Sequence, residues 1–387
     1  MDNETNDSYL GFEQGPIRPP SEAYSLLVRV TRNCPWNQCT FCPVYKGTKF
    51  SRRPVEHVKR DIDGVYQHVE AIRELADEQG RVPRSEINRI TANIDPQKSP
   101  AFVAGFNWYF AGGLKSVFIQ DANSLIIKPT DLVEILRHLK KRFPEIKRIT
   151  SYARSQTVSR MKEEDLKAIG DAGLNRIHIG LESGSDEVLK MVKKGVTKEM
   201  HIQAGVKVKK AGMELSEYYM PGLGGKKLWK EHTLETADTL NQINPDFIRM
   251  RTLAIPNHAP LFQDHQAGVF EKCTDLMVVK EIWMFIEKLE GITSVVKSDH
   301  ILNLFQDLEG ALPRDKDCMI KILRTFLAMG PERQRLYQLG RRIGVFSQLS
   351  DMENPHRMAR AEKAYSQLEG AKEDIDKVTD ELMKRFI

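Results

Sequence analysis

Short apolar runs alternate with longer segments of helical periodicity between residues 24 and 255. The strand-like runs lie at residues 26–31, 116–120, 148–152, 176–181, 214–220 and 247–253. Helices are predicted at residues 55–78, 129–142, 162–172, 197–211 and 229–244, and Gly173 and Gly212 follow two of them as helix-ending residues. Strands that alternate with helices predict a parallel α/β sheet.

The segments outside this alternation suggest four parts of the chain. Residues 1–22, with Gly15-Pro16 and Pro19-Pro20, predict an extended lead-in to a sheet domain at residues 23–256. After Pro256 we expect a mixed extension over the sheet at residues 257–325 and a charged helical appendage at residues 326–387. In the last part, apolar positions recur at amphipathic spacing: Met358, Ala361, Ala364 and Leu368.

The stretch between the first two strands, about residues 50–115, is longer than one crossover needs. Its aromatic segment at residues 106–110 predicts an extra helix packed on the domain, and a lid or partner surface is the alternative.

Composition indicates a large domain in a reducing compartment. Of the 387 residues 41% are hydrophobic, the mean hydropathy is −0.44, and no apolar run approaches the length of a membrane span. The acidic start is unlike a secretory signal, and five cysteines, three of them clustered, argue against a disulfide framework. We therefore expect a cytoplasmic protein. A net charge of +5, from 58 Lys and Arg against 53 Asp and Glu, does not support nucleic-acid binding.

The clustered thiols Cys34, Cys39 and Cys42 follow the first strand with the spacing C-x4-C-x2-C. Soft sulfur ligands select iron–sulfur clusters, zinc or copper. A plant-type [2Fe–2S] centre needs a fourth cysteine, but the next ones are Cys273 and Cys318, far down the chain. A structural zinc site also needs a fourth nearby Cys or His. The third interpretation is a [4Fe–4S] cluster on three thiolates, with an open iron suited to chemistry.

Two segments resemble the radical S-adenosylmethionine (SAM) superfamily. One is the cysteine loop with Phe41 before its last thiol, although the commonest family spacing, C-x3-C-x2-C, is one residue shorter. The other is the run RIHIGLESGSDEVLKMVKKG at residues 176–195, which is similar to the branch with oxygen-independent coproporphyrinogen oxidase and methylthiotransferases. The resemblance covers roughly residues 24–255 and implies a partial (β/α)6 TIM-like barrel.

The resemblance also implies the chemistry. Cys34, Cys39 and Cys42 would bind a [4Fe–4S] cluster whose open iron chelates SAM. An electron from a donor such as ferredoxin or flavodoxin would cleave SAM, and the resulting 5′-deoxyadenosyl radical would take hydrogen from a small-molecule substrate. A non-catalytic cluster carrier or haem chaperone of the same fold is the alternative function, and a structural zinc protein is a further one.

Residues at the carboxyl ends of the strands are expected to bind SAM, because active residues of barrel enzymes gather there. Asp121 would replace the Gly-Gly-Glu segment of relatives toward the SAM ammonium, or else form a helix-capping turn. Arg154 would grip the methionyl carboxylate, or else form a surface salt bridge. Glu182 suits the ribose diol or the amine, and Gly222 and Tyr45 the adenine. The full set is Tyr45, Gln120, Asp121, Asn123, Ser151, Arg154, Glu182, Ser183, Gly222, Arg251 and Leu253.

His300 is the one candidate for direct action on substrate. It precedes an apolar run at residues 301–305, so Ser298 or Asp299 could instead cap a helix there. His258 is expected in a turn, and Cys273 and Cys318 as small buried hydrophobic residues.

Overall fold

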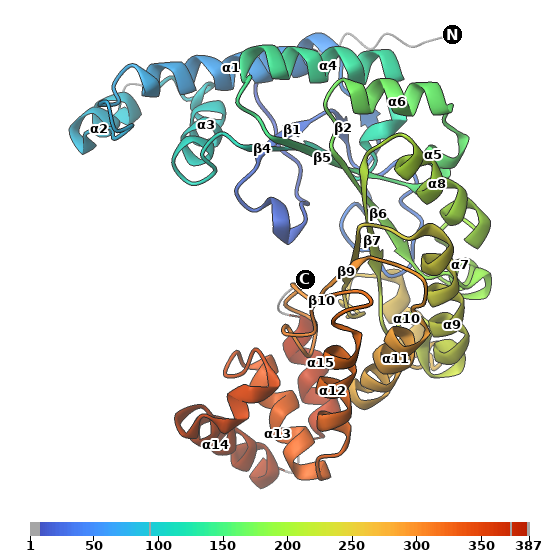
Figure 1. Cartoon of the computed structure of the whole chain (residues 1–387). Helices are drawn as coiled ribbons and strands as arrows, with labels where there is room; N and C mark the ends of the chain where they lie inside the picture. Colours follow the sequence, from blue (N-terminus) through green and yellow to red (C-terminus); the bar gives the residue numbers. More distant parts are fainter. Residues whose placement is uncertain (1–7, 93, 372–373, 385–387) are drawn as a thin grey trace. The chain divides into compact units, whose positions relative to one another are not determined.

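The computed structural model describes residues 8–92, 94–371 and 374–384 (Figure 1). The chain forms two compact units, which are described separately. Unit 1 comprises Met1–Pro35, Gly47–His178 and Lys210–Met213. Unit 2 comprises Trp36–Lys46, Ile179–Lys209 and Glu214–Ile387.

Unit 1 contains the first parallel strands of the fold. β1 (Leu26–Arg29), β4 (Ser116–Gln120) and β5 (Arg148–Ala153) pair in this order, with Leu26 opposite Val117 and Val117 opposite Ile149. Their apolar residues are fully buried because helices pack on the sheet. The other elements around these strands are η1 (Pro20–Glu22), the β2 (Thr31–Arg32) and β3 (Ser51–Arg52) ribbon, η2 (Ser124–Ile126), α4 (Pro129–Arg142), α5 (Ser155–Arg160) and α6 (Glu163–Asp171).

The long connection between β1 and β4 forms three helices, α1 (Val55–Arg73), α2 (Arg84–Ala92) and α3 (Ser99–Phe110). α3 packs on α1 and on β1, and its Trp108 is buried, so the predicted extra helix is confirmed. The helix expected to reach residue 78 ends at Arg73, because residues 77–80 form a turn closed by the Asp77 carbonyl.

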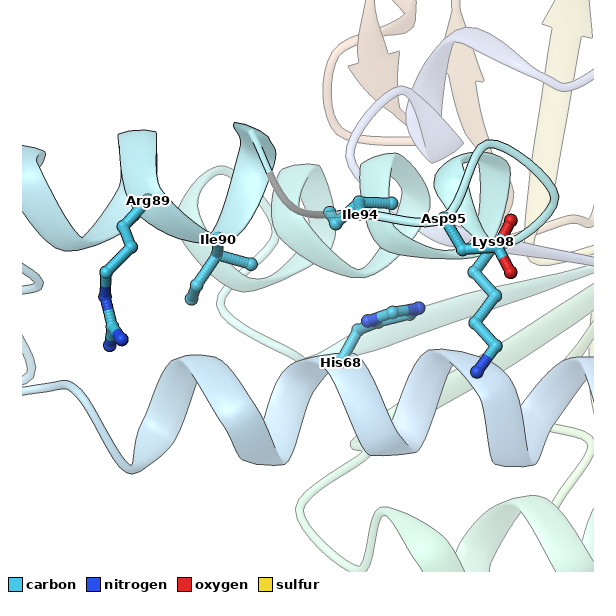
Figure 2. Close-up of a pocket in the computed structure, with 6 residues that line it drawn as sticks. All are labelled: His68, Arg89, Ile90, Ile94, Asp95 and Lys98. Carbon is cyan, nitrogen blue, oxygen red and sulfur yellow. The ribbon is translucent and has the colours of Figure 1, made fainter.

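A surface pocket lies beside α1 and α2. It is lined by His68, Arg89, Ile90, Ile94, Asp95 and Lys98, and Figure 2 shows His68 rising from α1 toward the segment that carries Ile94. None of the site residues expected from the sequence lines this pocket.

Unit 2 continues the parallel pattern. β7 (Glu214–Tyr219), β8 (Phe247–Met250) and β9 (Val295–Lys297) pair in parallel, and β10 (Gly310–Ala311) pairs antiparallel to β9. β6 (Arg176–Glu182) divides between the units, since its first three residues belong to unit 1. The helices after β6 and β7 are α7 (Asp186–Met191), α8 (Lys198–Lys210) and α9 (Gly225–Ile243). The predicted α/β class with a mostly parallel sheet is therefore confirmed.

β9 lies inside the segment that was expected to follow the sheet domain. The alternation of strands and helices thus does not stop at Pro256, as the sequence pattern indicated, because β9 pairs with β8 in parallel. α10 (Pro260–Gln266) and α11 (Asp275–Lys288) connect them. A strand of only three residues is too short to give a clear periodic signal.

The rest of unit 2 is helical, as expected, and consists of α12 (Lys316–Leu327), α13 (Pro331–Arg342), η3 (Leu349–Glu353), α14 (Pro355–Ala371) and α15 (Ile375–Lys384) (Figure 1). Two details differ from the sequence predictions. Residues 301–305 form turns rather than a helix, because the Ser298 hydroxyl donates to the Phe305 carbonyl at 2.5 Å. Cys318 is exposed on α12, whereas Cys273 is buried as expected. Among the described residues, no helix is long and apolar enough to cross a membrane.

Two glycines within helices should respond oppositely to alanine. A Cβ on Gly64 of α1 would meet only the Ala101 Cβ at 3.8 Å, so Gly64→Ala should raise the free energy of unfolding by about 0.5–1 kcal/mol. A Cβ on Gly205 of α8 would lie 2.5 Å from Ile243 Cγ2 of α9, so Gly205→Ala should lower it by about 1–3 kcal/mol. Urea denaturation of both variants measures this, and a stabilised Gly205→Ala would contradict the packing of α8 on α9.

Candidate functional site

The part of the cysteine loop in unit 2 is fixed to the end of helix α7. The Trp36 indole N–H donates to the Lys193 carbonyl at 2.7 Å, and the Thr40 N–H donates to the Val192 carbonyl at 3.0 Å. On its other side, the Thr40 carbonyl accepts from the Leu261 N–H at 2.9 Å. Backbone partners on two separate segments therefore hold the loop in one conformation.

Two backbone positions let the loop make these contacts. Asn37 has a φ of +47°, in the left-handed region that asparagine tolerates, so the chain can turn between Cys34 and Cys39. Gly195 has a φ of +71°, and a Cβ there would lie 2.3 Å from the Trp36 ring. Gly195, the last residue of the segment at residues 176–195, therefore lets the Trp36 indole lie against the backbone.

The three thiols differ in exposure. Cys39 is buried, whereas Cys34 and Cys42 are partly exposed, and all are free of disulfides. Cys34 belongs to unit 1, and Cys39 and Cys42 belong to unit 2. Within the described residues, no group of three or more His, Cys, Asp or Glu side chains is placed to hold a metal ion. The donor set itself, soft thiols within a nine-residue span, suits an iron–sulfur cluster.

A small pocket lies beside Cys42 in unit 2. It brings together two residues expected from the sequence, Arg251 and Leu253, with the thiol-bearing loop. These two lie just beyond the end of β8 at Met250, not on the strand as the sequence pattern suggested. The other lining residues are Phe41, Pro43, Val44, Met220, Thr252, Ala254 and Leu302.

The end of β6 has an unusual backbone. Glu182 has a φ of +64°, a value that is rare outside glycine and concentrated at functional sites. Its carboxylate lies 3.2 Å from Lys194 Nζ, and that ammonium also lies over the Phe41 ring at 5.6 Å. Glu182 therefore has the partner that a largely buried carboxylate requires, and the pair adjoins the cysteine loop.

His232 of α9 links the ends of β6 and β7. Its Nε2 lies 3.1 Å from the Met220 carbonyl and its Nδ1 lies 2.8 Å from the Ser183 hydroxyl. A carbonyl can only accept, so Nε2 carries the proton and Nδ1 accepts from Ser183. Burial lowers the pKa of His232 to about 4, so the ring is neutral near pH 7.

Glu281 of α11 holds the turn that follows β7. Its Oε1 accepts from the Tyr219 hydroxyl at 2.7 Å and from the Gly222 N–H at 2.9 Å. Burial raises the pKa of Glu281 to about 8, against the opposing effect of these hydrogen bonds. The sequence analysis missed both His232 and Glu281. The sequence did contain a sign of Glu281, because this carboxylate lies within an apolar stretch of α11 that includes Val278, Val279 and Ile282.

In unit 1, the two residues at the end of β4 have partners from the N-terminal segment. The Gln120 side chain accepts from the Gly15 N–H at 2.8 Å and donates to the Ile17 carbonyl at 2.7 Å. Asp121 is fully buried and pairs with Arg29 at 2.9 Å, and Gly15 lies against its carboxylate. The N-cap residue of α4 is Lys128, so Asp121 is not the cap of that helix, and its expected contact with the SAM ammonium stays a prediction.

The remaining predicted residues are held by local hydrogen bonds. Asn123 accepts from the Arg154 N–H at 3.0 Å and donates to the Thr157 hydroxyl at 2.8 Å. Ser151 is buried and donates to the Ile119 carbonyl at 3.1 Å. Tyr45, expected near adenine, has a buried side chain that is 3% exposed. Asn123 and Ser151 thus connect β4 to β5 within unit 1.

Glu281 should make the stability of the protein depend on pH. The pKa of Glu281 is higher in the folded chain than the ordinary 4.5. Its contribution to the free energy of unfolding is therefore fully present below about pH 4.5 and is lost as pH rises through about 8. Glu281→Gln keeps the acceptor but cannot ionise. Between pH 5 and 8 the unfolding free energy of the native protein should therefore fall relative to this variant, by at most about 1.4 kcal/mol per pH unit.

Chemical denaturation at a series of pH values measures this difference. His232 Nε2 lies 3.4 Å from Glu281 Oε1, but its pKa of about 4 keeps the folded ring neutral between pH 5 and 8, so its contribution should be similar in both proteins. Glu290→Gln, a change at an exposed carboxylate just after α11, serves as the control and should follow the native curve. Parallel curves for the native protein and Glu281→Gln would show that Glu281 is not protonated in the folded state.

Comparison with known proteins finds similarity over part of the chain. A model of the Radical SAM superfamily matches residues 102–237, from α3 to α9, a range that does not include the cysteine loop. The tRNA-2-methylthio-N(6)-dimethylallyladenosine synthase of Christiangramia forsetii is 27% identical over 197 residues, which is 50% of this chain and 35% of that protein. The tRNA uridine(34) acetyltransferase of Methanocaldococcus jannaschii is 22% identical over 269 residues, which is 66% of this chain and 47% of that protein.

The chain spans less than half the length of either relative. Among solved structures, coproporphyrinogen III oxidase from Escherichia coli, described as a radical SAM enzyme, aligns with a TM-score of 0.44 at 15% identity, covering 68% of this chain and 52% of that one. The match to the family model agrees with the fold class expected from the sequence, an α/β fold with the partial TIM-like barrel core. Residues 102–237 therefore form a domain that matches the Radical SAM superfamily.

Proposed function

We propose that this protein cleaves SAM reductively at a [4Fe–4S] cluster held by Cys34, Cys39 and Cys42 and uses the resulting radical on a small-molecule substrate. The observation that supports this most directly is the anchoring of the cysteine loop. Trp36 and Thr40 bind the carbonyls of Lys193 and Val192, which belong to the segment matched by the family model. A loop outside the matched segment is thereby fixed on the superfamily domain.

Residues of unit 2 are proposed to form the wall that faces SAM and the substrate. Arg251 and Leu253 line the pocket beside Cys42, and Glu182 stands at the end of β6 with its charge balanced by Lys194. The Gly222 backbone is held by Glu281 and has a φ of +88°, which leaves room for the close approach of a planar ring. Bound there, the cluster and SAM would supply the radical, while Glu182, Gly222 and Leu253 orient the cofactor and Arg251 faces the substrate.

The other predicted residues are proposed to support this wall. Ser183 and Asn123 fix the ends of β6 and β4 through His232 and the Arg154 backbone. Gln120 and Asp121 already bind Gly15 and Arg29 inside unit 1, so a role in holding the SAM ammonium would require them to exchange partners. The electron donor is proposed to be a ferredoxin or flavodoxin.

Anaerobic purification with iron and sulfide analysis tests the cluster. We expect about four iron and four sulfide per chain, lost in Cys39→Ala. Cys318→Ala, a change at an exposed thiol on α12, is the matched control and should keep the full content. Zinc in place of iron, or a full cluster in Cys39→Ala, would contradict the assignment of the ligands.

Incubation of the cluster-loaded protein with SAM and dithionite tests catalysis. The native protein and Cys318→Ala should form 5′-deoxyadenosine and methionine, and Cys39→Ala should form neither. SAM that remains intact beside a reduced cluster would point instead to a cluster carrier or haem chaperone.

A further inference from the structure

Arg251 carries a charge that the protein does not neutralise. Arg249, two residues earlier, pairs with Asp299 at 2.5 Å. In contrast, the Arg251 guanidinium makes no ion pair or side-chain hydrogen bond within the described parts of the chain, residues 8–92, 94–371 and 374–384. The Arg251 N–H donates to the Tyr219 carbonyl, so its backbone is held in place beside β7.

The surroundings of this charge are apolar. Arg251 is partly buried in the pocket beside Cys42, where Phe41, Val44 and Leu302 supply hydrocarbon surface. A guanidinium that is partly removed from water and has no counter-ion costs free energy. A bound anion would offset that cost, and the apolar walls would accept a hydrocarbon chain attached to it.

His300 adds a neutral donor within electrostatic reach of Arg251. Its Nδ1 accepts from the Leu302 N–H at 3.2 Å, which leaves the ring proton on Nε2. Burial and then the charge of Arg251 lower the pKa of His300 to about 4, so the ring is uncharged near pH 7. The planar guanidinium of Arg251 by itself matches the two oxygens of a carboxylate.

We propose that Arg251 binds a carboxylate of the substrate in the pocket next to Cys42. The identification of the bound anion as a substrate group rests on the proposed function. The pocket and the unbalanced charge of Arg251 do not depend on it. SAM also contains a carboxylate, so Arg251 could bind the carboxylate of SAM or that of the substrate. An experiment must distinguish the two.

Calorimetry with hexanoate, against its neutral isostere hexanamide, tests the subsite in the full chain. Hexanoate should bind the native protein at least about 10-fold more tightly than hexanamide, because only the carboxylate forms a charge-assisted pair with Arg251. Arg251→Gln should abolish this preference and Arg251→Lys should keep part of it. Arg335→Gln removes an exposed charge on α13 and should change nothing. Equal binding of the two probes by the native protein would overturn the proposal, whether or not Arg251→Gln folds.

SAM binding to the cluster-loaded protein separates the two sources of the carboxylate. Arg251→Gln should bind SAM within about 2-fold of the native protein. A loss of 10-fold or more would assign the anion to SAM and overturn the substrate assignment. The hexanoate measurement needs no cluster. If the protein assembles no iron–sulfur cluster but still prefers hexanoate, only the proposed function is contradicted. Cluster-loaded protein that binds both probes equally would contradict this inference alone.

Discussion

The buried hydrogen bonds of Glu281 and His232 are the constraint on which the proposed wall depends. Glu281 reaches from α11 to the Gly222 N–H, and His232 reaches from α9 to the Met220 carbonyl. Both side chains are fully buried, where an unpaired polar group would be costly. The backbone at the end of β7 can therefore move only if several buried hydrogen bonds break together, and the turn that carries Gly222 stays in place.

The cysteine loop is held by the same means on another part of unit 2. Its indole and amide donors bind the carbonyls of Lys193 and Val192, the two residues that follow α7. Gly195 permits the approach because any side chain there would meet the Trp36 ring. A loop anchored in this way presents its thiols from a rigid support, as a site that must bind a cluster and a cofactor requires.

Charge is distributed unevenly along the segment after β8. Arg249 and Asp299 neutralise each other, and Lys194 and Glu182 form a second pair near the cysteine loop. Arg251 lines the pocket beside Cys42 and has no acidic partner among the described residues. This partly buried, unbalanced charge gives the pocket its selectivity for anions.

The sequence by itself determined the parallel α/β class, most strands and helices, and the position of the thiols, because periodicity and spacing are local properties of the chain. Strand β4 and helix α4 begin and end where the pattern indicated. Only the tertiary structure decided that β9 joins β8, that residues 301–305 turn instead of forming a helix, and that Asp121 pairs with Arg29. Each of these depends on partners that no local pattern identifies: β8 for β9, the Ser298 hydroxyl for the turn, and Arg29 of β1 for Asp121.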